Sequence, residues 1–454
     1  MTKIELPGYV ETVIERLADH GYESYAVGGC VRDHLMGKTP HDYDITTSAE
    51  PGQVAECFEG FRIIATGLKH GTLTVLSEDH PIEITTYRTD GEYEDNRHPK
   101  QVAFTKSLSD DLSRRDFTIN AMAYNHKTGL VDLFGGREDL RGGVIRCVGE
   151  ADVRFNEDGL RIIRALRFAS CLGFGLDSGT RESVFRNMRL LENISSERIY
   201  AEFSKLICGM GAADILYEYR DVFCVVIPEL RPMIDHPQRT KYHCYDVYMH
   251  TIKAIEASPP DKIVRYALLF HDSGKPDACT VDPDGTMHFK GHDKISAEIS
   301  ERALRRLKTD RELQVEVKKL VEYHSLVLTD NEKSLRRLLG KLSFDEVRRL
   351  IEVEKADSIA HAPDYRTRAK TLDDVLAAVD RIEKENLCVK IKDLEINGKD
   401  VMSLGVGEGR LIGDVLERLL SMVVEGEIPN RRDVLLDRAR EIIEKSNSEE
   451  KDSV

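Results

Sequence analysis

Tryptophan is absent from this 454-residue sequence, and its nine cysteines include no Cys-x-x-Cys pair. Scattered cysteines of this kind favour reduced thiols in a cytoplasmic protein over a disulfide framework. No apolar run approaches the roughly 20 residues that a membrane-spanning helix needs, and residues 1–17 lack the apolar core of a signal peptide. There is no internal repeat, and no low-complexity tract precedes the polar tail after Ser446. We therefore expect a cytoplasmic protein with no membrane partner.

Excess positive charge is missing as well. The 80 Asp and Glu residues outnumber the 65 Lys and Arg residues, which gives a net charge of −15. Such a balance argues against broad electrostatic binding to nucleic acid. Residues 154–205 are a local exception, with nine Lys or Arg against seven Asp or Glu. With 41% hydrophobic residues, the chain is long enough for about two to four globular domains.

The most informative stretch is residues 25–47, YAVGGCVRDHLMGKTPHDYDITT. It predicts a strand that runs into Gly28 and Gly29, where the backbone can turn tightly and approach a ligand. A short helix is expected over residues 31–36. Its free N–H groups, with Arg32 beside them, suit a triphosphate.

Two acidic residues follow on a second predicted strand. Asp42 and Asp44 are two residues apart, so on a strand they point to the same face. Two carboxylates beside a phosphate cradle predict a Mg²⁺ site, and paired ions can stabilise both the attacking and leaving oxygens of phosphoryl transfer. Glu83, on a strand expected over residues 82–88, is a candidate third carboxylate, although the pattern fits a solvent-facing Glu equally well.

Together the GG-x-V-R-D and D-x-D elements resemble the signature of the polymerase-β-like nucleotidyltransferases. Among these, the sequence is most similar to the class II CCA-adding tRNA nucleotidyltransferases and the bacterial poly(A) polymerases. The string RRDFTINA at residues 114–121 matches the second motif of that family. The resemblance implies that Arg115 reaches the triphosphate and that Asp116 and Asn120 bind the ribose.

A polar, turn-rich segment at residues 89–110 precedes that motif and is expected to be irregular. Its Y-x-D-x-R-x-P pattern resembles a flexible loop of the family, which implies that it helps one site to handle both nucleotides. The pattern consists of Tyr93, Asp95, Arg97 and Pro99.

Helical periodicity replaces strands after residue 150. A helix is expected to begin at residues 156–158, with an apolar stripe and beside it a stripe of charge. The simplest interpretation of the charged stripe is a solvated face with i,i+3 ion pairs. The charged residues are Asp158, Arg161, Arg164 and Arg167.

Base chemistry suggests a second interpretation of the same stripe. C and A both offer an exocyclic amine beside a ring-nitrogen acceptor, whereas G and U place a carbonyl oxygen where the amine would be. Asp158 could accept from the amine while Arg161 donates to the ring nitrogen, so that C and A are selected. The string E-D-x-L-R-x-x-R-A-x-R-F-A resembles the family's fourth motif, which acts there as a protein template for CTP and ATP. Residues 195–202 resemble its fifth motif, for which we expect a structural role.

A second constellation lies in the helical half. His271 and Asp272 end an apolar run and precede Ser-Gly-Lys, and adjacent His and Asp at a helix end can reach one metal. The pattern H … HD-x-GK … H … H … D resembles the HD phosphohydrolases, which implies a divalent metal such as Ni, Mn, Fe or Mg. His243 is the residue most easily confused with these ligands. The remaining candidates are His250 and Asp357, with His292 and His324 as ligands of a second ion or as ordinary histidines.

The resemblance extends over nearly the whole chain and implies an α+β fold. We expect a polymerase-β-like nucleotidyltransferase head with a mixed sheet, followed by an all-α neck, body and tail, and the tail is expected to bind tRNA. The implied reaction is addition of CCA to the 3′ end of tRNA from CTP and ATP by a two-Mg²⁺ mechanism. The predicted domains are residues 1–150 (head), 151–210 (neck with the base-selecting helix), 211–370 (body with the HD module) and 371–454 (tail).

Other functions remain open at this stage. A poly(A) polymerase or an A-adding-only member of the same family would share every motif, although the acidic composition argues against generic RNA binding. An HD phosphohydrolase with a nucleotide-sensing head, or a non-catalytic tRNA-binding protein, would not need the paired carboxylates Asp42 and Asp44. The sequence does not indicate an oligomeric state.

Overall fold

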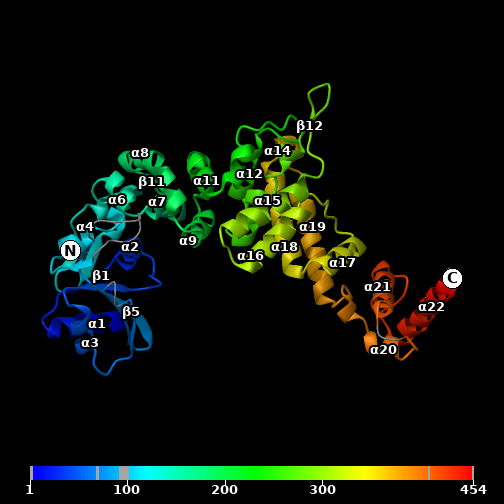
Figure 1. Cartoon of the computed structure of the whole chain (residues 1–454), viewed down its shortest axis with the longest axis horizontal. Coiled ribbons are helices and arrows are strands. Elements are labelled where there is room, and N and C mark those ends of the chain that lie inside the picture. Colours follow the sequence, from blue (N-terminus) through cyan, green and yellow to red (C-terminus); the bar gives the residue numbers. More distant parts are fainter. Residues whose placement is uncertain (1–3, 68–70, 91–101, 407–408, 452–454) are drawn as a thin grey trace. The chain divides into compact units, whose positions relative to one another are not determined.

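The computed structural model describes residues 4–67, 71–90, 102–406 and 409–451 (Figure 1). By its contacts the chain divides into two compact units. The first comprises residues up to 231 together with 305–309, and the second comprises the remainder. The finer division into head, neck, body and tail stays a prediction. Within the described residues, no helix is long and apolar enough to cross a membrane.

A seven-stranded mixed sheet organises the first unit, in the order β3-β4-β5-β2-β1-β8-β9. Only the β2–β5 pair is parallel among the pairings of this sheet in the described residues. The three strands expected between residues 62 and 88 are confirmed as β3, β4 and β5. The strands are β1 (Ser24–Val27), β2 (Asp44–Thr47), β3 (Ile63–Gly67), β4 (Thr72–Ser77), β5 (His80–Thr86), β8 (Met122–Asn125) and β9 (Gly129–Asp132).

One face of this sheet carries the hydrophobic core. Ile45 of β2 and Ile84 of β5 are buried there with apolar residues of α1 (Gly8–Asp19) and α3 (Pro51–Cys57). Because side chains alternate along a strand, Asp44 and Glu83 face away from this core. The opposite face is therefore the one that can meet a ligand. The other helices of the sheet region are α2 (Gly29–Leu35), α4 (Leu108–Ser113) and α5 (Gly136–Gly142).

The segment expected to be irregular at residues 89–110 is partly ordered, so that prediction is wrong for its two ends. β6 (Arg88–Asp90) pairs antiparallel with β7 (Val102–Phe104), and α4 begins at Leu108. The four residues of the Y-x-D-x-R-x-P pattern lie outside the described residues.

Helices complete the first unit. The prediction that a helix begins at residues 156–158 is wrong. One helix, α6 (Ala151–Glu157), ends at this point, and the next, α7 (Leu160–Leu172), begins after Asp158 and Gly159. A Cβ on Gly159 would lie 3.0 Å from the Leu190 Cβ, so the chain breaks where a neighbouring segment approaches closely. The remaining elements are β10 (Val144–Ile145), β11 (Gly175–Leu176), α8 (Ser178–Asn187), α9 (Ser196–Ile207), α10 (Ala212–Glu218) and α11 (Arg220–Val226).

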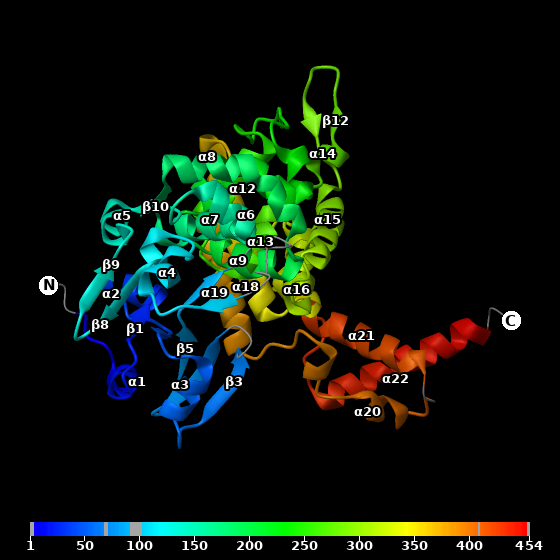
Figure 2. The same ribbon diagram turned by 60° about the vertical axis from the view of Figure 1, so that its left-hand side comes forward.

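In its described residues, the second unit is helical apart from a small hairpin. Helices α12, α13, α16 and α18 pack against one another, whereas α20, α21 and α22 enclose a separate apolar core (Figure 2). A mixed-sheet head followed by helices confirms the predicted fold class. The elements are α12 (Val247–Ala257), α13 (Lys262–Phe270), α14 (Lys275–Ala278), β12 (Thr280–Val281), β13 (Met287–His288), α15 (His292–Arg306), α16 (Arg311–Tyr323), α17 (Glu332–Lys341), α18 (Phe344–Ala360), α19 (Arg368–Lys384), α20 (Gly398–Met402), α21 (Arg410–Glu425) and α22 (Arg432–Lys451).

Candidate functional site

Three carboxylates meet on the ligand-facing side of the sheet. Tyr43 is buried between Asp42 and Asp44, which are both exposed, so the two acids share the outer face although β2 begins only at Asp44. Asp44 lies directly opposite Glu83 in the parallel β2–β5 register. The pairing places Glu83 beside Asp44. Of the two interpretations of Glu83, a third carboxylate or an ordinary solvent-facing Glu, this position favours the third carboxylate.

The electrostatics of Asp44 reflect this crowding. Burial by surrounding protein raises the pKa of Asp44 even though the side chain stays accessible, and the charges of Glu83 and Asp42 add to the rise. Arg115 opposes it. Mutual repulsion between acids is relieved by a divalent cation, so the donor set fits Mg²⁺. Among the described residues, sets of three ligand atoms within 4.8 Å occur only in the second unit, so these acids are gathered less tightly.

The predicted glycine turn lies beside Arg115. Gly28 has a φ of +78°, and a Cβ there would lie 3.1 Å from the Arg115 Nη1. A side chain at this position would therefore be strained and would crowd the guanidinium. Arg115 Nη2 is held by Asp111 at 3.3 Å, and Gly29 begins α2. The turn thus leaves a cation and the first N–H groups of α2 close together, as phosphate binding requires.

The residues predicted for the ribose form a continuous polar chain. Arg32 Nη1 donates to the Asn120 Oδ1 at 2.7 Å, and Asn120 Nδ2 donates to the Asp116 Oδ1 at 3.1 Å. Arg164 donates to the Asp116 Oδ2 from Nε at 3.0 Å and from Nη2 at 2.7 Å. Burial alone would raise the pKa of Asp116, but Arg164 outweighs it and lowers that pKa, so the carboxylate stays ionised.

Glu202 of α9 extends this chain, and the structural role expected for residues 195–202 did not single it out. Arg164 Nη1 donates to one of its carboxylate oxygens at 3.1 Å, and Arg167 pairs with the other. The Arg167 guanidinium also stacks 3.7 Å from the centre of the Phe168 ring. Two of the three arginines of the predicted stripe, Arg164 and Arg167, are therefore held by the neighbouring helix.

The side chains of Asp158 and Arg161, the predicted base-reading pair, are not bonded to each other in the described structure. Asp158 instead contacts Arg198 of α9. Asp158 Oδ2 accepts from the Arg198 Nη2 at 2.7 Å, and its Oδ1 accepts from the Leu160 N–H at 3.1 Å. Arg161 Nη1 donates to the Glu157 Oε2 at 2.7 Å. Asp158 and Arg161 therefore each have another partner, and their joint role in base selection stays a prediction.

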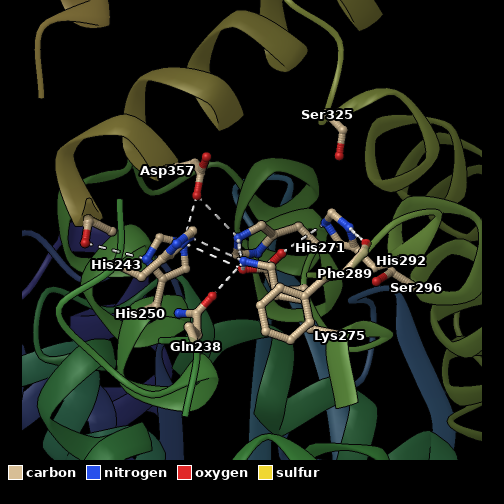
Figure 3. Close-up of polar contacts among 12 residues, drawn as sticks. Gln238, His243, His250, His271, Lys275, Phe289, His292, Ser296, Ser325 and Asp357 are labelled. Carbon is tan, nitrogen blue, oxygen red and sulfur yellow. Dashed lines mark hydrogen bonds and ion pairs between the residues drawn. The ribbon is translucent and has the colours of Figure 1, made fainter. Parts of the chain in front are cut away.

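In the second unit, six predicted ligands from five helical segments gather in one cluster around Asp272, and Figure 3 labels His250, His271, His292 and Asp357 among them. The turn after α13 supplies two of them, and α12, α15, α18 and the end of α16 supply one each. The six are His250 on α12, His271 and Asp272 after α13, His292 at the start of α15, His324 after α16, and Asp357 on α18.

The histidines of this cluster are oriented by backbone carbonyls. The Nδ1 atoms of His271, His292 and His324 each lie 2.6–2.8 Å from the carbonyl three residues earlier. His250 Nδ1 likewise lies 3.4 Å from the Ala360 carbonyl. Because a carbonyl only accepts, each Nδ1 carries a proton, and each Nε2 faces inward as a potential metal ligand.

The inward atoms form two groups that share Asp272. His250 and His271 point their Nε2 atoms at the Asp272 Oδ2, at 3.5 and 3.3 Å, and at the Asp357 Oδ1, at 2.7 and 3.4 Å. His292 and His324 lie 3.3 and 3.8 Å from the Asp272 Oδ1, with their Nε2 atoms 3.2 Å apart.

The inward Nε2 atoms and the oxygens of Asp272 and Asp357 all present lone pairs to one another, so positive charge between them relieves their repulsion. Burial opposes protonation of His271, but Asp272 and Asp357 raise its pKa to about 10. His271 Nε2 is buried and has no hydrogen-bond partner in the described structure, whereas Asp272 Oδ2 forms an ion pair with Lys275. Imidazole and a bridging carboxylate suit transition metals, so the donor set fits two divalent ions.

Three further residues adjoin the cluster. His243, which the sequence marked as a source of confusion, lies with its ring centre 5.0 Å from that of His250 and 4.9 Å from that of His361. Lys275 Nζ lies 2.6 Å from the Asp272 Oδ2. His361 was not predicted, and its only sequence signal is its place four residues after Asp357.

Three family models match parts of this chain. A family model described as "Poly A polymerase head domain" matches residues 24–146. Models described as "Probable RNA and SrmB- binding site of polymerase A" and as tRNA nucleotidyltransferase domain 2 match residues 173–232 and 292–439.

Individual relatives extend the match along the chain. A CCA-adding enzyme of Lactiplantibacillus plantarum is 33% identical over 446 residues, which cover 96% of each chain. One from Geobacillus thermodenitrificans is 49% identical over 204 residues, which cover 45% of this chain and 50% of the relative. The crystal structure of the Bacillus stearothermophilus CCA-adding enzyme in complex with CTP aligns with a TM-score of 0.71 at 28% identity, covering 98% of this chain and all of the other. With this full-length similarity and the resembling motifs in place, the chain belongs to the CCA-adding enzymes, a family of tRNA nucleotidyltransferases.

Proposed function

We propose that this protein adds CCA to the 3′ end of tRNA, using CTP and ATP and releasing pyrophosphate. The observation that carries the proposal is the position of Asp42, Asp44 and Glu83 on one face, beside the Gly28 turn and Arg115. Family membership and the CTP bound to the related crystal structure support the choice of nucleotide.

Asp42 and Asp44 would hold Mg²⁺, which supplies activation of the 3′-hydroxyl and charge neutralisation of the triphosphate when bound. Arg115 and Arg32 bind phosphate oxygens, and the first N–H groups of α2 add neutral donors. Asn120 and Asp116, already joined by a hydrogen bond, offer acceptors and a donor to the ribose.

Base selection is assigned to Asp158 and Arg161. Asp158 has acceptor capacity left, because a carboxylate has about four lone-pair sites and two are used in the structure. Arg161 donates to the base from its guanidinium, which has five N–H donors and pairs with Glu157 through Nη1 in the structure. Arg198 holds the Asp158 side chain in place by donating to its Oδ2.

The test uses tRNA that lacks its 3′ end and each labelled NTP separately. We expect C incorporation with CTP alone, completion with CTP and ATP together, and rejection of UTP and GTP. Long A tails would identify a poly(A) polymerase instead, and incorporation of A only onto tRNA ending in CC would identify an A-adding member.

We also propose a second activity, hydrolysis of phosphate esters at the histidine cluster. It rests on the four inward Nε2 atoms around Asp272 and Asp357, which fit Ni, Mn, Fe or Mg. Bound ions would supply an activated water and charge neutralisation. Metal analysis of the purified full-length chain tests it, together with release of nitrophenol from phosphate esters. A chain without bound metal and without hydrolysis would refute it.

A further inference from the structure

Asp111 of α4 is a buried acid beside the residues proposed to bind the nucleotide. Its side chain is completely buried, although it carries a carboxylate. Removing a carboxylate from water is costly unless charged or hydrogen-bonding partners replace the water. The partners of Asp111 therefore indicate what this side chain does.

These partners come from three segments of the first unit. Thr46 Oγ1, on β2 two residues after Asp44, donates to the Asp111 Oδ2 at 3.0 Å. The backbone N–H of Arg88, the first residue of β6, donates to the Asp111 Oδ1 at 3.4 Å. Arg114 donates to the same Oδ1 from Nε at 3.1 Å and from Nη2 at 2.6 Å. Asp111 thus ties α4 to the strand that carries Asp44.

The remaining partner is Arg115, whose Nη2 lies 3.3 Å from the Asp111 Oδ2. A guanidinium is planar and rigid, so holding one of its nitrogens sets the direction of the others. The Nη1 of Arg115 is the atom that lies beside the Gly28 turn, and the side chain is 21% exposed. A ligand can therefore reach N–H groups of Arg115 that Asp111 orients but does not use.

Arg114 limits how far Asp111 can neutralise Arg115. One carboxylate is shared by two guanidiniums, so the three side chains together have a net charge of plus one. The contacts of Arg114 with Asp111 are also the shorter ones. Burial alone would raise the pKa of Asp111, but Arg115 and Arg114 outweigh it and lower that pKa, so the carboxylate stays ionised. Positive charge is thus left over for a phosphate.

We propose that Asp111 is a positioning residue that orients Arg115 toward the triphosphate of the incoming nucleotide, while Arg114 takes up the charge of Asp111. The inference rests on the proposed nucleotide addition. Asp111 is buried and touches no substrate, so it acts only through Arg115. Because Thr46 holds the same carboxylate oxygen, Arg115 is fixed relative to the strand of Asp44.

Two other roles for Asp111 make different predictions. A purely structural acid would pin α4 to the sheet, and its removal would lower stability and kcat without acting on phosphate binding in particular. An inhibitory acid would repel the triphosphate, and its removal would tighten the binding of phosphates. Shared pairing with Arg114 weakens that repulsion, so the contacts favour positioning.

The experiment uses Asp111→Asn in the full-length chain, which removes the charge and keeps one acceptor oxygen. Nucleotide addition to tRNA that lacks its 3′ end gives KM and kcat for CTP, and inhibition by pyrophosphate reports phosphate binding without a base. We expect KM and the inhibition constant to rise about tenfold each, the effect of one charge-assisted hydrogen bond. The kcat and the preference for CTP over UTP should change far less.

Asp110→Asn is the matched control. Asp110 is the neighbouring acid of α4, and its carboxylate accepts from the Thr105 Oγ1 at 3.1 Å rather than from an arginine. This variant should leave KM, kcat and pyrophosphate inhibition unchanged.

Two further variants keep the proposal testable. In an Arg115→Ala background, Asp111→Asn should raise KM no further, because interacting residues are not additive and Asp111 acts only through Arg115. Thr46→Val removes one donor to Asp111 and serves where Asp111→Asn does not fold. It should raise the inhibition constant of pyrophosphate about threefold, the effect of one neutral hydrogen bond.

The other outcomes overturn the proposal. Tighter inhibition by pyrophosphate in Asp111→Asn would identify an inhibitory acid. A lower kcat with unchanged KM, or additive losses in the double variant, would identify a structural acid. A wild-type chain that adds no nucleotide refutes the proposed function itself, whereas an active wild type with an unaffected Asp111→Asn variant refutes only the positioning role.

Discussion

The three acidic side chains of the candidate site in the first unit are exposed to solvent, whereas the candidate metal ligands of the second unit are enclosed by helices. Asp42, Asp44 and Glu83 are accessible, and in the proposed reaction the substrate phosphates would complete their metal site. His271 and Asp272 are buried, with partners already arranged before any ion binds. Mg²⁺ prefers to share its coordination with substrate phosphates and water, whereas imidazole ligands suit a site built wholly by the protein.

This difference predicts that the two sites respond separately to substitution and to metal removal. An exposed acid can be removed without disturbing the core, because it makes few contacts. A buried ligand holds neighbouring charges in balance, so its loss changes stability as well as chemistry.

The largest effect is expected for Asp44→Ala. Nucleotide addition should fall by at least about 1000-fold, because removal of even one transition-state contact commonly costs 100- to 1000-fold. Primer extension on tRNA lacking its 3′ end measures it, and Asp42→Ala should behave alike. Asp19→Ala, at an exposed acid of α1, is the matched control. Substantial incorporation by Asp44→Ala under ordinary Mg²⁺ would refute the assignment, and bound metal in the second unit should be unchanged.

Asp272→Asn should impair the site of the second unit and leave that of the first unit intact. One carboxylate serves both groups of histidines, so we expect loss of Mn²⁺ binding and of phosphate-ester hydrolysis, with nucleotide addition retained. Thermal unfolding with and without chelator measures the coupling to stability. At an ion concentration 100 times Kd, the wild type should lose about 2.7 kcal/mol on chelation and the variant nothing. An equal loss of nucleotide addition would contradict independent sites.

Asp158→Ala should change selectivity more than rate. Loss of the repelling acceptor should relax rejection of UTP and GTP by about 10- to 100-fold, in line with the 1–3 kcal/mol of a base contact. Competition between labelled nucleotides measures the ratio. Asp152→Ala, which removes an acid of α6 bound to Arg186, is the control. Unchanged selectivity would rule out the base-reading role.

The smallest effect concerns an acid behind the histidine cluster. Burial raises the pKa of Glu354 to about 8, although Arg368 lies 2.8 Å away and opposes the rise. The folded state therefore keeps a proton that the unfolded chain releases above about pH 4.5, and stability is lost as the pH rises to 8. Glu354→Gln should lack this loss, worth about 2 kcal/mol between pH 6 and 8. Parallel Tm profiles of wild type and variant would show no divergence if Glu354 titrates normally.

Local motifs were predictable because their residues are neighbours in the chain. The Gly28 turn, the outward acids of residues 42–44 and the strands of residues 62–88 follow from backbone freedom and alternation. The break at Gly159 was not predictable, because acids before an apolar stripe also mark a helix start. Leu190, 31 residues later, approaches this break so closely that a Cβ on Gly159 would lie 3.0 Å from the Leu190 Cβ.

The sequence by itself determined which chemical groups are available: paired carboxylates after a glycine turn, and a series of histidines around an His-Asp pair. The tertiary structure alone decided their partners. Glu83 joins Asp44 through strand pairing, Arg198 takes Asp158, and His243 and His361 reach the cluster through helix packing. The physical reason is that side-chain identity sets what a group can bind, whereas long-range packing sets the distance at which charge and hydrogen bonding act.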